Sequence, residues 1–351
     1  MSSIPFIVRL RLECDRLSWD AFVDGCDEAW LWHRYDLQDA IAARRRIDLS
    51  FAVCDDKQGA ILAVVPLHLV QGRFVRVAPW NVLNSTGAPA LKSDLGEKPR
   101  RQLMEFIRER LIQLARQYQA FAVDLTYSQL APAFRGERCP RINPLLEWGC
   151  ENSLSQTYVL DLRQSEAVLR AGYSKTTRNE LNRIERESVE IREATPNDLD
   201  LYYQLHCETY QRTGVPPHPK AYFQHIFEVF IPQGLSRVVF LLRDGEVVAA
   251  HNAGRYKGAA FYWTGASRSE KTVGEGRILM HNQIRQAQAD GLGWFETGEA
   301  FPHLRSGKLK GLNDFKRSFG GELYPIYKGQ LPVDRRLAAL AAGIRAWRTP
   351  F

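Results

Sequence analysis

The sequence contains no apolar run long enough to cross a membrane as a helix, which takes about 20 residues. The best candidate, Ala60 to Val70, is interrupted by a proline and a histidine. The first residues, Met1-Ser-Ser-Ile-Pro5, lack the basic-then-apolar layout of a secretory signal peptide. We therefore expect a cytoplasmic protein, with peripheral contact to the inner membrane as an open alternative.

Cysteine is scarce and scattered. The six cysteines form no C-x-x-C pair and have no histidine partner at the spacing of a zinc site. Scattered cysteines without a disulfide framework fit a reducing compartment. The sequence also lacks a Gly-x-Ser-x-Gly elbow for a nucleophilic serine. We expect no metal site and no tightly bound cofactor, and any group transfer should proceed by direct attack without a covalent intermediate.

Positive charge is concentrated in the last part of the chain. Residues 301–351 contain ten lysines and arginines against three acids, which accounts for the whole net charge of +7. Such a region attracts phosphates, nucleic acid such as tRNA, or anionic lipid. The alternative is a solvated surface whose opposite charges come from elsewhere in the fold.

The end of this basic region has the pattern of an amphipathic helix. Between Pro332 and Trp347 an apolar stripe is surrounded by arginines; the stripe consists of Leu337, Leu340, Ala341, Ile344 and Trp347. Such a helix can dock on its own protein or on a second subunit. It can also lie on an anionic membrane, which would suit a lipid-linked substrate.

Two stretches of the chain repeat one plan. A hairpin pattern at residues 50–69 is followed by an amphipathic helix at 100–119 and a strand at 120–124. The same order returns with a hairpin at 237–255, a helix at 277–290 and a strand at 293–296. Residues 128–156, which contain three prolines, separate the copies. We predict an α/β (α+β) protein of two tandem domains, 1–150 and 151–351, each a mixed, largely antiparallel sheet flanked by helices.

The second copy begins with a strand at residues 157–162 and a long predicted helix from about Ser165 to Glu187. On that helix Lys175, Arg178, Asn182 and Arg186 fall close to one stripe by their spacing. One interpretation is a surface helix stabilised by salt bridges to neighbouring glutamates. The other is a basic stripe that faces an anionic substrate.

Two further motifs point to an anionic, activated donor. Lys271-x-x-Gly274-x-Gly276 opens a helix with glycines, which exposes backbone N–H groups and the positive end of the helix dipole to a phosphate. Downstream, Lys316 lies between Phe315 and Phe319, and Gly320-Gly321 closes the segment. A lysine beside aromatic rings can be partly desolvated, which strengthens its effect on an oxyanion or phosphate.

With these motifs in this order, the sequence resembles the Fem-type transferases and their GNAT-like acyltransferase relatives. The matching segments are Arg178 with Arg183, Gly274 to Leu279, Glu296-Thr-Gly298, and Phe315-Lys316 through Gly321. The resemblance implies an enzyme that moves an acyl or aminoacyl group onto a small-molecule or lipid-linked amine, in cell-envelope or polysaccharide metabolism. It implies aminoacyl-tRNA or acyl-CoA as co-substrate. The span from Asp198 to Arg237 is too short for the coiled-coil arm of some Fem proteins, which leans toward acyl-CoA.

The resemblance and the residue chemistry together suggest roles for twelve residues, in a site that we expect in a cleft between the two domains. The catalytic candidates are Lys316, Glu296, Glu299 and His251. The donor-binding candidates are Lys271, Gly274, Gly276 and Arg277. The substrate-binding candidates are Arg178, Arg183, Phe315 and Arg34, the last being a loose match for the N-terminal substrate lysine of Fem proteins. The competing hypothesis is a non-catalytic GNAT-like module that recognises nucleic acid or an envelope partner, and donor binding discriminates between the two.

Overall fold

The computed structural model describes residues 6–71, 81–153, 155–187, 189–268 and 274–338. The chain folds into two compact units. One is formed by residues 1–154 together with residues 326–351, and the other by residues 155–325. Each unit is an α/β structure of mixed, largely antiparallel sheets flanked by helices, which confirms the predicted fold class.

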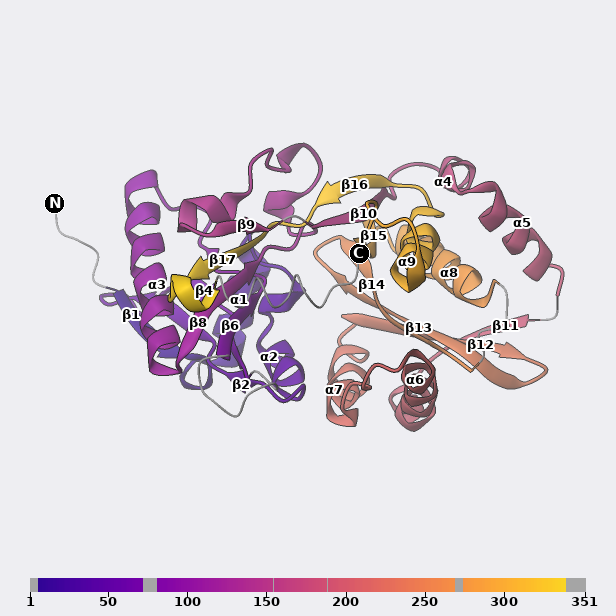
Figure 1. The fold of residues 1–351 in the computed structure, drawn as a ribbon, viewed down its shortest axis with the longest axis horizontal. Helices are drawn as coiled ribbons and strands as arrows, with labels where there is room; N and C mark the ends of the chain where they lie inside the picture. Colours follow the sequence, from indigo (N-terminus) through magenta and orange to yellow (C-terminus); the bar gives the residue numbers. More distant parts are fainter. Residues whose placement is uncertain (1–5, 72–80, 154, 188, 269–273, 339–351) are drawn as a thin grey trace. The chain divides into compact units, whose positions relative to one another are not determined.

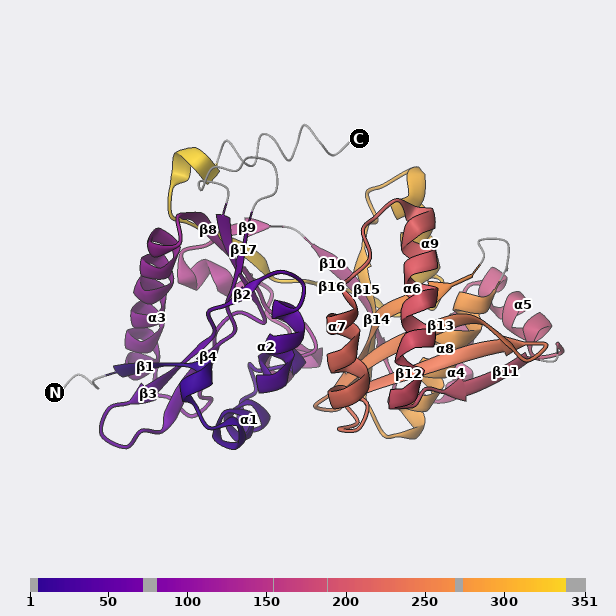
Figure 2. The ribbon, with the colours of Figure 1, turned by 90° about the horizontal axis from the view of Figure 1, so that it is seen from below.

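The second unit is built on one seven-stranded sheet in the order β11-β12-β13-β14-β15-β10-β16. Its strands are β10 (Gln156–Asp161), β11 (Val189–Glu193), β12 (Ser236–Arg243), β13 (Glu246–Tyr256), β14 (Ala259–Ser267), β15 (Trp294–Ala300) and β16 (Glu322–Pro325). Its helices are α4 (Glu166–Gly172), α5 (Lys175–Ile184), α6 (Leu199–Thr213), α7 (Lys220–Gln224), which continues as a π-helical turn at His225–Phe230, α8 (Glu275–Ala289) and α9 (Gly307–Arg317). Helices α6 and α7 cover one face of the sheet, and α8 and α9 lie on the other (Figures 1 and 2).

Strands β14 and β15 separate along their length. They form the parallel pair of this sheet, and they pair only where Ala259–Phe261 lies beside Trp294–Glu296. Beyond that point β14 continues to Ser267 beside β13, whereas β15 continues to Ala300 beside β10. The two strands therefore diverge toward their carboxyl ends, where α8 begins and α9 ends.

The predicted helix from Ser165 to Glu187 is wrong in one respect, because the structure contains two helices there. Tyr173 is extended, and its ring packs edge-on against Phe319 and His281. Ser174 then caps α5 by accepting a hydrogen bond from the Thr177 N–H at 3.2 Å. The buried Tyr173 thus lies at the end of α4, and the Ser174 cap begins α5.

The first unit repeats this plan with its sheet divided in two. Its strands are β1 (Phe6–Leu10), β2 (Ile47–Asp48), β3 (Phe51–Asp55), β4 (Ile61–Val65), β5 (His68–Val70), β6 (Asn81–Thr86), β7 (Ala90–Leu91), β8 (Ala120–Thr126), β9 (Glu151–Ser153) and β17 (Lys328–Pro332). They form a four-stranded sheet, β1-β3-β4-β7, and a six-stranded sheet, β2-β5-β6-β8-β17-β9. Helix α3 (Glu97–Gln117) lies on the opposite side of these strands from α2 (Tyr35–Ala42), and α1 (Arg16–Gly25) precedes α2 (Figure 2).

The predicted repeat has direct counterparts in the structure. Hairpin β3–β4 corresponds to β12–β13, α3 corresponds to α8, and β8 corresponds to β15. Each copy also contains a parallel strand pair, β6 with β8 and β14 with β15. In α8 the predicted apolar face is buried, since Ile278, Leu279 and Ile284 are at most 8% exposed.

The predicted extent of the second domain, 151–351, differs from the structure at the C-terminal end. Strand β17 hydrogen-bonds to β8 on one side and β9 on the other, so the chain after Pro325 returns to the first unit. The predicted tail helix begins at residues 335–338, where Ala338 packs against Phe121 of β8. The rest of that helix, including Leu340, Ala341, Ile344 and Trp347, lies outside the described residues. In the described part of the chain no helix is long and apolar enough to span a membrane.

Candidate functional site

Lys316 is a buried lysine in the last turn of α9, with only 6% of its surface exposed. Its Nζ donates a hydrogen bond of 2.7 Å to the backbone oxygen of Glu299 on β15. Burial lowers the pKa of the Lys316 ammonium, whereas the nearby Glu296 and Glu299 carboxylates act to raise it. The ammonium therefore sits in a low-dielectric site with two acidic neighbours, where its interactions are stronger than in water.

The aromatic surroundings of Lys316 differ from the sequence prediction. Helix α9 directs Phe315 and Phe319 against each other, edge to face at 5.4 Å, and the ring near the Nζ is Phe301 at 5.8 Å. The closing glycines do not offer backbone to a ligand either. A Cβ at Gly320 or Gly321 would press on the backbone of Gly172 or Val159, so this pair packs against its own chain.

A β-bulge brings Glu296 and Glu299 to the same face of the sheet. In the pairing of β10 with β15, Thr157 lies opposite Glu299 and Val159 lies opposite Glu296, so β15 has one extra residue. Gly298 takes up the bulge with a φ of +98°, which favours glycine. The Thr157 hydroxyl donates to Glu296 at 2.8 Å, and the Ser155 hydroxyl donates to Glu299. Without the bulge, residues three apart on a strand would point to opposite faces.

The lysine and the bulge form one structure, which we call the Lys316 cluster: Lys316, Glu296, Gly298 and Glu299. A Cβ at Gly298 would lie 3.1 Å from the Lys316 Nζ, so the lysine passes directly over the bulge. The cluster joins three of the four predicted catalytic residues. A general acid or base pair beside a cation is an arrangement suited to proton transfer and to stabilising an oxyanion.

The glycine-opened helix is present as predicted. Gly274 is the N-cap of α8 with a φ of +98°, and Gly276 follows in the first turn. The guanidinium of Arg277, a predicted donor contact, forms an ion pair of 2.6 Å with Glu180 of α5. Lys271 lies outside the described residues. N–H groups at the start of a helix can donate hydrogen bonds to a phosphate, and donor binding here stays a prediction.

Gly274→Ala should destabilise the protein by about 1–3 kcal/mol, because a Cβ there would combine a positive φ with a collision against the Ile184 side chain. Chemical denaturation measures the change. Gly291→Ala is the matched control, since Gly291 has a φ of +75° but open space around it. The free energy of unfolding of the control should fall by about 1 kcal/mol from backbone strain alone. Equal losses in both variants would contradict the steric argument.

His251, the fourth catalytic candidate, lies on β13 opposite Gly265 of β14. It is therefore one strand away from the opening between β14 and β15. Burial lowers the pKa of His251 to about 3, so the ring is neutral at physiological pH and is a weak base. The ring lines a cavity of about 210 Å³ together with Tyr262, Glu275, Gly276 and Phe315.

The three arginines predicted to bind substrate all have partners within the chain. Arg178 donates to the backbone oxygens of Ala171, at 2.9 Å, and of Tyr173, which ties α4 to α5. Arg183 lies 3.8 Å from Glu187 and is exposed. Arg34 forms ion pairs with Asp20 and Asp24, at 3.0 and 2.9 Å. These contacts fit structural roles, and substrate binding by these arginines stays a prediction.

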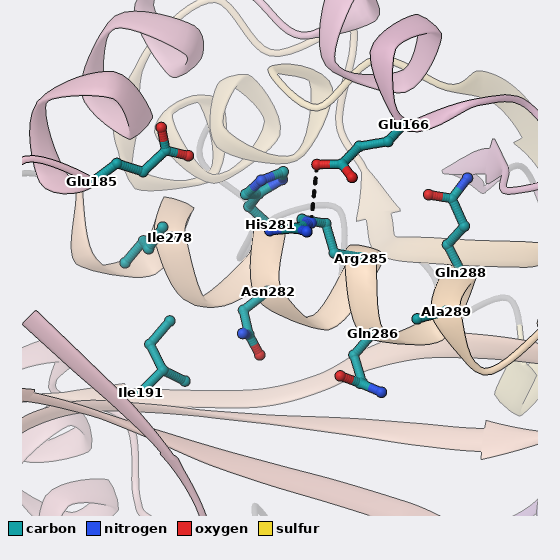
Figure 3. Close-up of a pocket in the computed structure, with 10 residues that line it drawn as sticks. All are labelled: Glu166, Glu185, Ile191, Ile278, His281, Asn282, Arg285, Gln286, Gln288 and Ala289. Carbon is teal, nitrogen blue, oxygen red and sulfur yellow. Dashed lines mark ion pairs between the residues drawn. The ribbon is translucent and has the colours of Figure 1, made fainter.

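A larger hollow of about 400 Å³ lies along α8 and contains none of the predicted site residues (Figure 3). Its charged groups neutralise one another: Arg285 pairs with Glu166 at 2.9 Å, and Glu185 pairs with Arg170 at 2.9 Å. His281 lies at its floor, with its Nδ1 3.2 Å from the Tyr173 hydroxyl. A hollow with internally paired charges offers little electrostatic attraction to an ionic substrate.

Sequence reasoning missed Phe301, the hydroxyls of Ser155 and Thr157, and Glu275. The two hydroxyls are brought to β15 by strand pairing across more than a hundred residues, which leaves no local signal. Phe301 follows β15 and comes near Lys316 because α9 packs beside that strand. Glu275 did have a signal, because a carboxylate at the first position of a helix is stabilised by the helix dipole and is placed beside whatever the helix binds.

Residues 171–317 match the family model described as an acetyltransferase (GNAT) domain. This part of the chain is thus similar to a GNAT acetyltransferase domain, and it includes the Lys316 cluster and helix α8. No curated protein sequence matches the chain.

Solved structures extend the likeness to both units. FemX is 12% identical with a TM-score of 0.69, covering 93% of this chain and 98% of its own. The C-terminal domain of a putative lysylphosphatidylglycerol synthetase from Agrobacterium fabrum is 16% identical with a TM-score of 0.59, covering 93% and 95%. A tandem GNAT protein from the clavulanic acid biosynthesis pathway is 13% identical with a TM-score of 0.52, covering 94% and 98%. The predicted resemblance to Fem-type and GNAT-like proteins is confirmed, and at these identities the likeness to solved structures is one of fold.

Proposed function

We propose that the protein transfers an acyl or aminoacyl group from an activated donor to an amine by direct attack. The observation that carries this proposal is the Lys316 cluster: a buried ammonium held over a β-bulge that presents two carboxylates on one face. An ammonium fixed in a low-dielectric site needs no reorganisation when negative charge develops beside it, which is the basis of oxyanion stabilisation. The GNAT domain match supports the same class of reaction.

In this proposal each member of the cluster has one task. The neutral amine attacks the carbonyl carbon of the donor, a C–N bond forms, and the carbonyl oxygen becomes anionic beside the Lys316 Nζ. Glu296 or Glu299 takes the proton that leaves the amine nitrogen. The carbonyl then re-forms as the bond to the donor's sulfur or oxygen breaks, and the leaving group takes up a proton. The bond to the Glu299 backbone oxygen holds the Nζ in position throughout.

The donor is acyl-CoA or aminoacyl-tRNA. The glycine-opened start of α8 supports an anionic donor of either kind, and the basic residues of 301–351 favour tRNA. The segment between Asp198 and Arg237 folds into α6, α7 and a π-helical turn, without a coiled-coil arm, which favours acyl-CoA. The acceptor in this proposal is a small-molecule or lipid-linked amine, used in the cytoplasm or at the inner face of the cell membrane.

Donor binding provides the first test. Acetyl-CoA and alanyl-tRNA are added separately to the purified protein, and its melting temperature is followed. A donor at about 100 times its Kd should stabilise the fold by about 2.7 kcal/mol and raise the melting temperature by several degrees. The donor that binds is then offered to a panel of amines, and release of free CoA or deacylated tRNA is measured. If neither donor changes the melting temperature when it is present well above about 100 μM, the protein is a non-catalytic binding module instead.

A further inference from the structure

The cavity at the start of α8 contains two buried polar groups without partners. Its walls come from β13, β14, α8 and α9, with Thr209 of α6 at one side. Glu275 is 2% exposed, and neither of its carboxylate oxygens has a hydrogen-bond partner among the described residues. His251 is 5% exposed, and its Nδ1 likewise has none in the described part of the chain. Two such groups, from a helix and from a strand, line the same space.

An unpartnered buried carboxylate is costly for a folded protein. Moving an ionised carboxylate out of water without compensating hydrogen bonds costs several kcal/mol. Arg243 attracts the Glu275 carboxylate but gives it no hydrogen bond, because its Nε lies 3.9 Å from the Glu275 Oε1 and its Nη1 donates to Glu187 at 2.8 Å. Buried polar groups without partners are rare in folded proteins, so each needs an explanation. A ligand that donates hydrogen bonds to Glu275 would supply the missing interactions.

The remaining walls indicate the chemistry of that ligand. Of the described residues that line the cavity, Glu275 is the one with an acidic side chain, so its carboxylate is the group there that can pair with a cation. The rings of Tyr262 and Phe315 supply two aromatic walls, and the Tyr262 and His251 rings are 4.9 Å apart. Aromatic faces attract cations through their quadrupole. The neutral imidazole of His251 has a ring nitrogen that can accept a hydrogen bond.

We propose that this cavity binds a primary ammonium group, with Glu275 as its counter-ion, His251 as an acceptor, and Tyr262 and Phe315 as its aromatic walls. The assignment to a substrate rests on the proposed function. Because an ammonium has no free lone pair, the group bound here is recognised and does not attack. It is either the α-ammonium of an aminoacyl donor or a second ammonium on the acceptor.

Binding of small ammonium probes tests the proposal without any transfer reaction. Isothermal titration is carried out with L-alaninamide, which mimics an aminoacyl group, with 1,4-diaminobutane, which mimics a diamine acceptor, and with 1-propanol as the neutral control. We expect at least one ammonium probe to bind and the alcohol not to bind. The tighter of the two ammonium probes identifies the donor or the acceptor as the source. Equal binding of alcohol and ammonium, or no binding of either ammonium probe, overturns the proposal.

The variant Glu275→Gln removes the charge and keeps the shape. It should weaken ammonium binding by at least about tenfold, the range expected for a lost charge-assisted hydrogen bond. Glu246→Gln is the control, because Glu246 lies on β13 and is 77% exposed. This variant should bind the ammonium probe as tightly as the original protein does. Unchanged binding in Glu275→Gln overturns the proposal.

The melting temperature separates ligand recognition from a structural role. Glu275→Gln should melt close to the melting temperature of the original protein, since the Glu275 carboxylate has no hydrogen-bond partner among the described residues and glutamine keeps its shape, whereas a carboxylate that stabilised the fold would give a much lower one. A much lower melting temperature therefore contradicts the proposal. The proposed function fails separately: if Lys316→Met retains full transfer while Glu275→Gln loses ammonium binding, the catalytic assignment is wrong and the ammonium site stands.

Discussion

Lys316→Met is expected to lower the rate of transfer by about 10²–10³-fold, the effect of removing one preorganised oxyanion donor. Methionine keeps much of the side-chain length and the apolar contact with Phe301 but has no ammonium. Because burial already lowers the pKa of Lys316, replacing it by an apolar side chain should leave the melting temperature unchanged or higher. The turnover number should fall while the Kd for the donor stays the same. Single-turnover kinetics with saturating donor measure the change.

Lys310→Met is the matched control on the same helix. Lys310 is 43% exposed and pairs with Asp314 one turn away, so its removal changes the surface of α9 but not the cluster. The transfer rate of Lys310→Met should stay within about twofold of the rate of the original protein, because exposed ion pairs contribute about 0.2–1 kcal/mol. Full activity in Lys316→Met, or an equal loss in both variants, would show that the cluster is not the transfer site.

Acidification from pH 7.5 to pH 5 is expected to lower the stability of the second unit sharply, because the unit contains three buried neutral histidines. His206, His251 and His281 are at most 5% exposed. Burial lowers the pKa of His251 to about 3 and the pKa values of His206 and His281 to about 4. In the unfolded chain all three return to about 6.5.

The direction of this pH effect follows from the protons that the unfolded chain takes up. Well above pH 6.5 both states are neutral at these positions, so the full stability is present. Between pH 6.5 and about 4 the unfolded state binds protons that the folded state does not, so the free energy of unfolding falls with falling pH. Each histidine contributes up to about 1.4 kcal/mol per pH unit. Urea denaturation at several pH values measures how steeply the free energy of unfolding depends on pH. His281→Gln should reduce this dependence by the contribution of about one proton. A flat profile from pH 7.5 to 5 would contradict the neutral histidines.

The hairpins, α8 and the strand after it were predictable from the sequence because their signals are local. An Asp-Gly turn between two apolar runs defined β12 and β13, and the spacing of Ile278, Leu279 and Ile284 defined the buried face of α8. The break at Tyr173 had a local signal in Gly172, a poor helix former, and in Ser174, a preferred N-cap, but the amphipathic spacing on both sides outweighed it in the prediction. The burial of the Tyr173 ring against Phe319 has no local signal. Propensity is a weak predictor where tertiary packing decides.

The candidate site was predictable in its residues but not in its geometry. Lys316, Glu296 and Glu299 were singled out from the sequence, yet their meeting depends on the bulge at Gly298, and a bulge arises from pairing with a strand about 140 residues earlier. The aromatic neighbour of the lysine was misassigned for a related reason. Phe315 is the immediate neighbour of Lys316 on α9 and points about 100° away from it. Phe319 lies beyond the end of α9, where its ring packs against Phe315.

The return of β17 to the first unit has a consequence for the order in which the protein forms on the ribosome. Strand β8 pairs with β6 on one side but lacks its second neighbour until Lys328–Pro332 has been synthesised, and by then every strand of the second unit has left the peptidyl-transferase centre. The N-terminal half, although made first, is completed last. The domain that contains the Lys316 cluster can close its own sheet while the half that precedes it still has an open edge, which is a natural binding surface for a chaperone during synthesis.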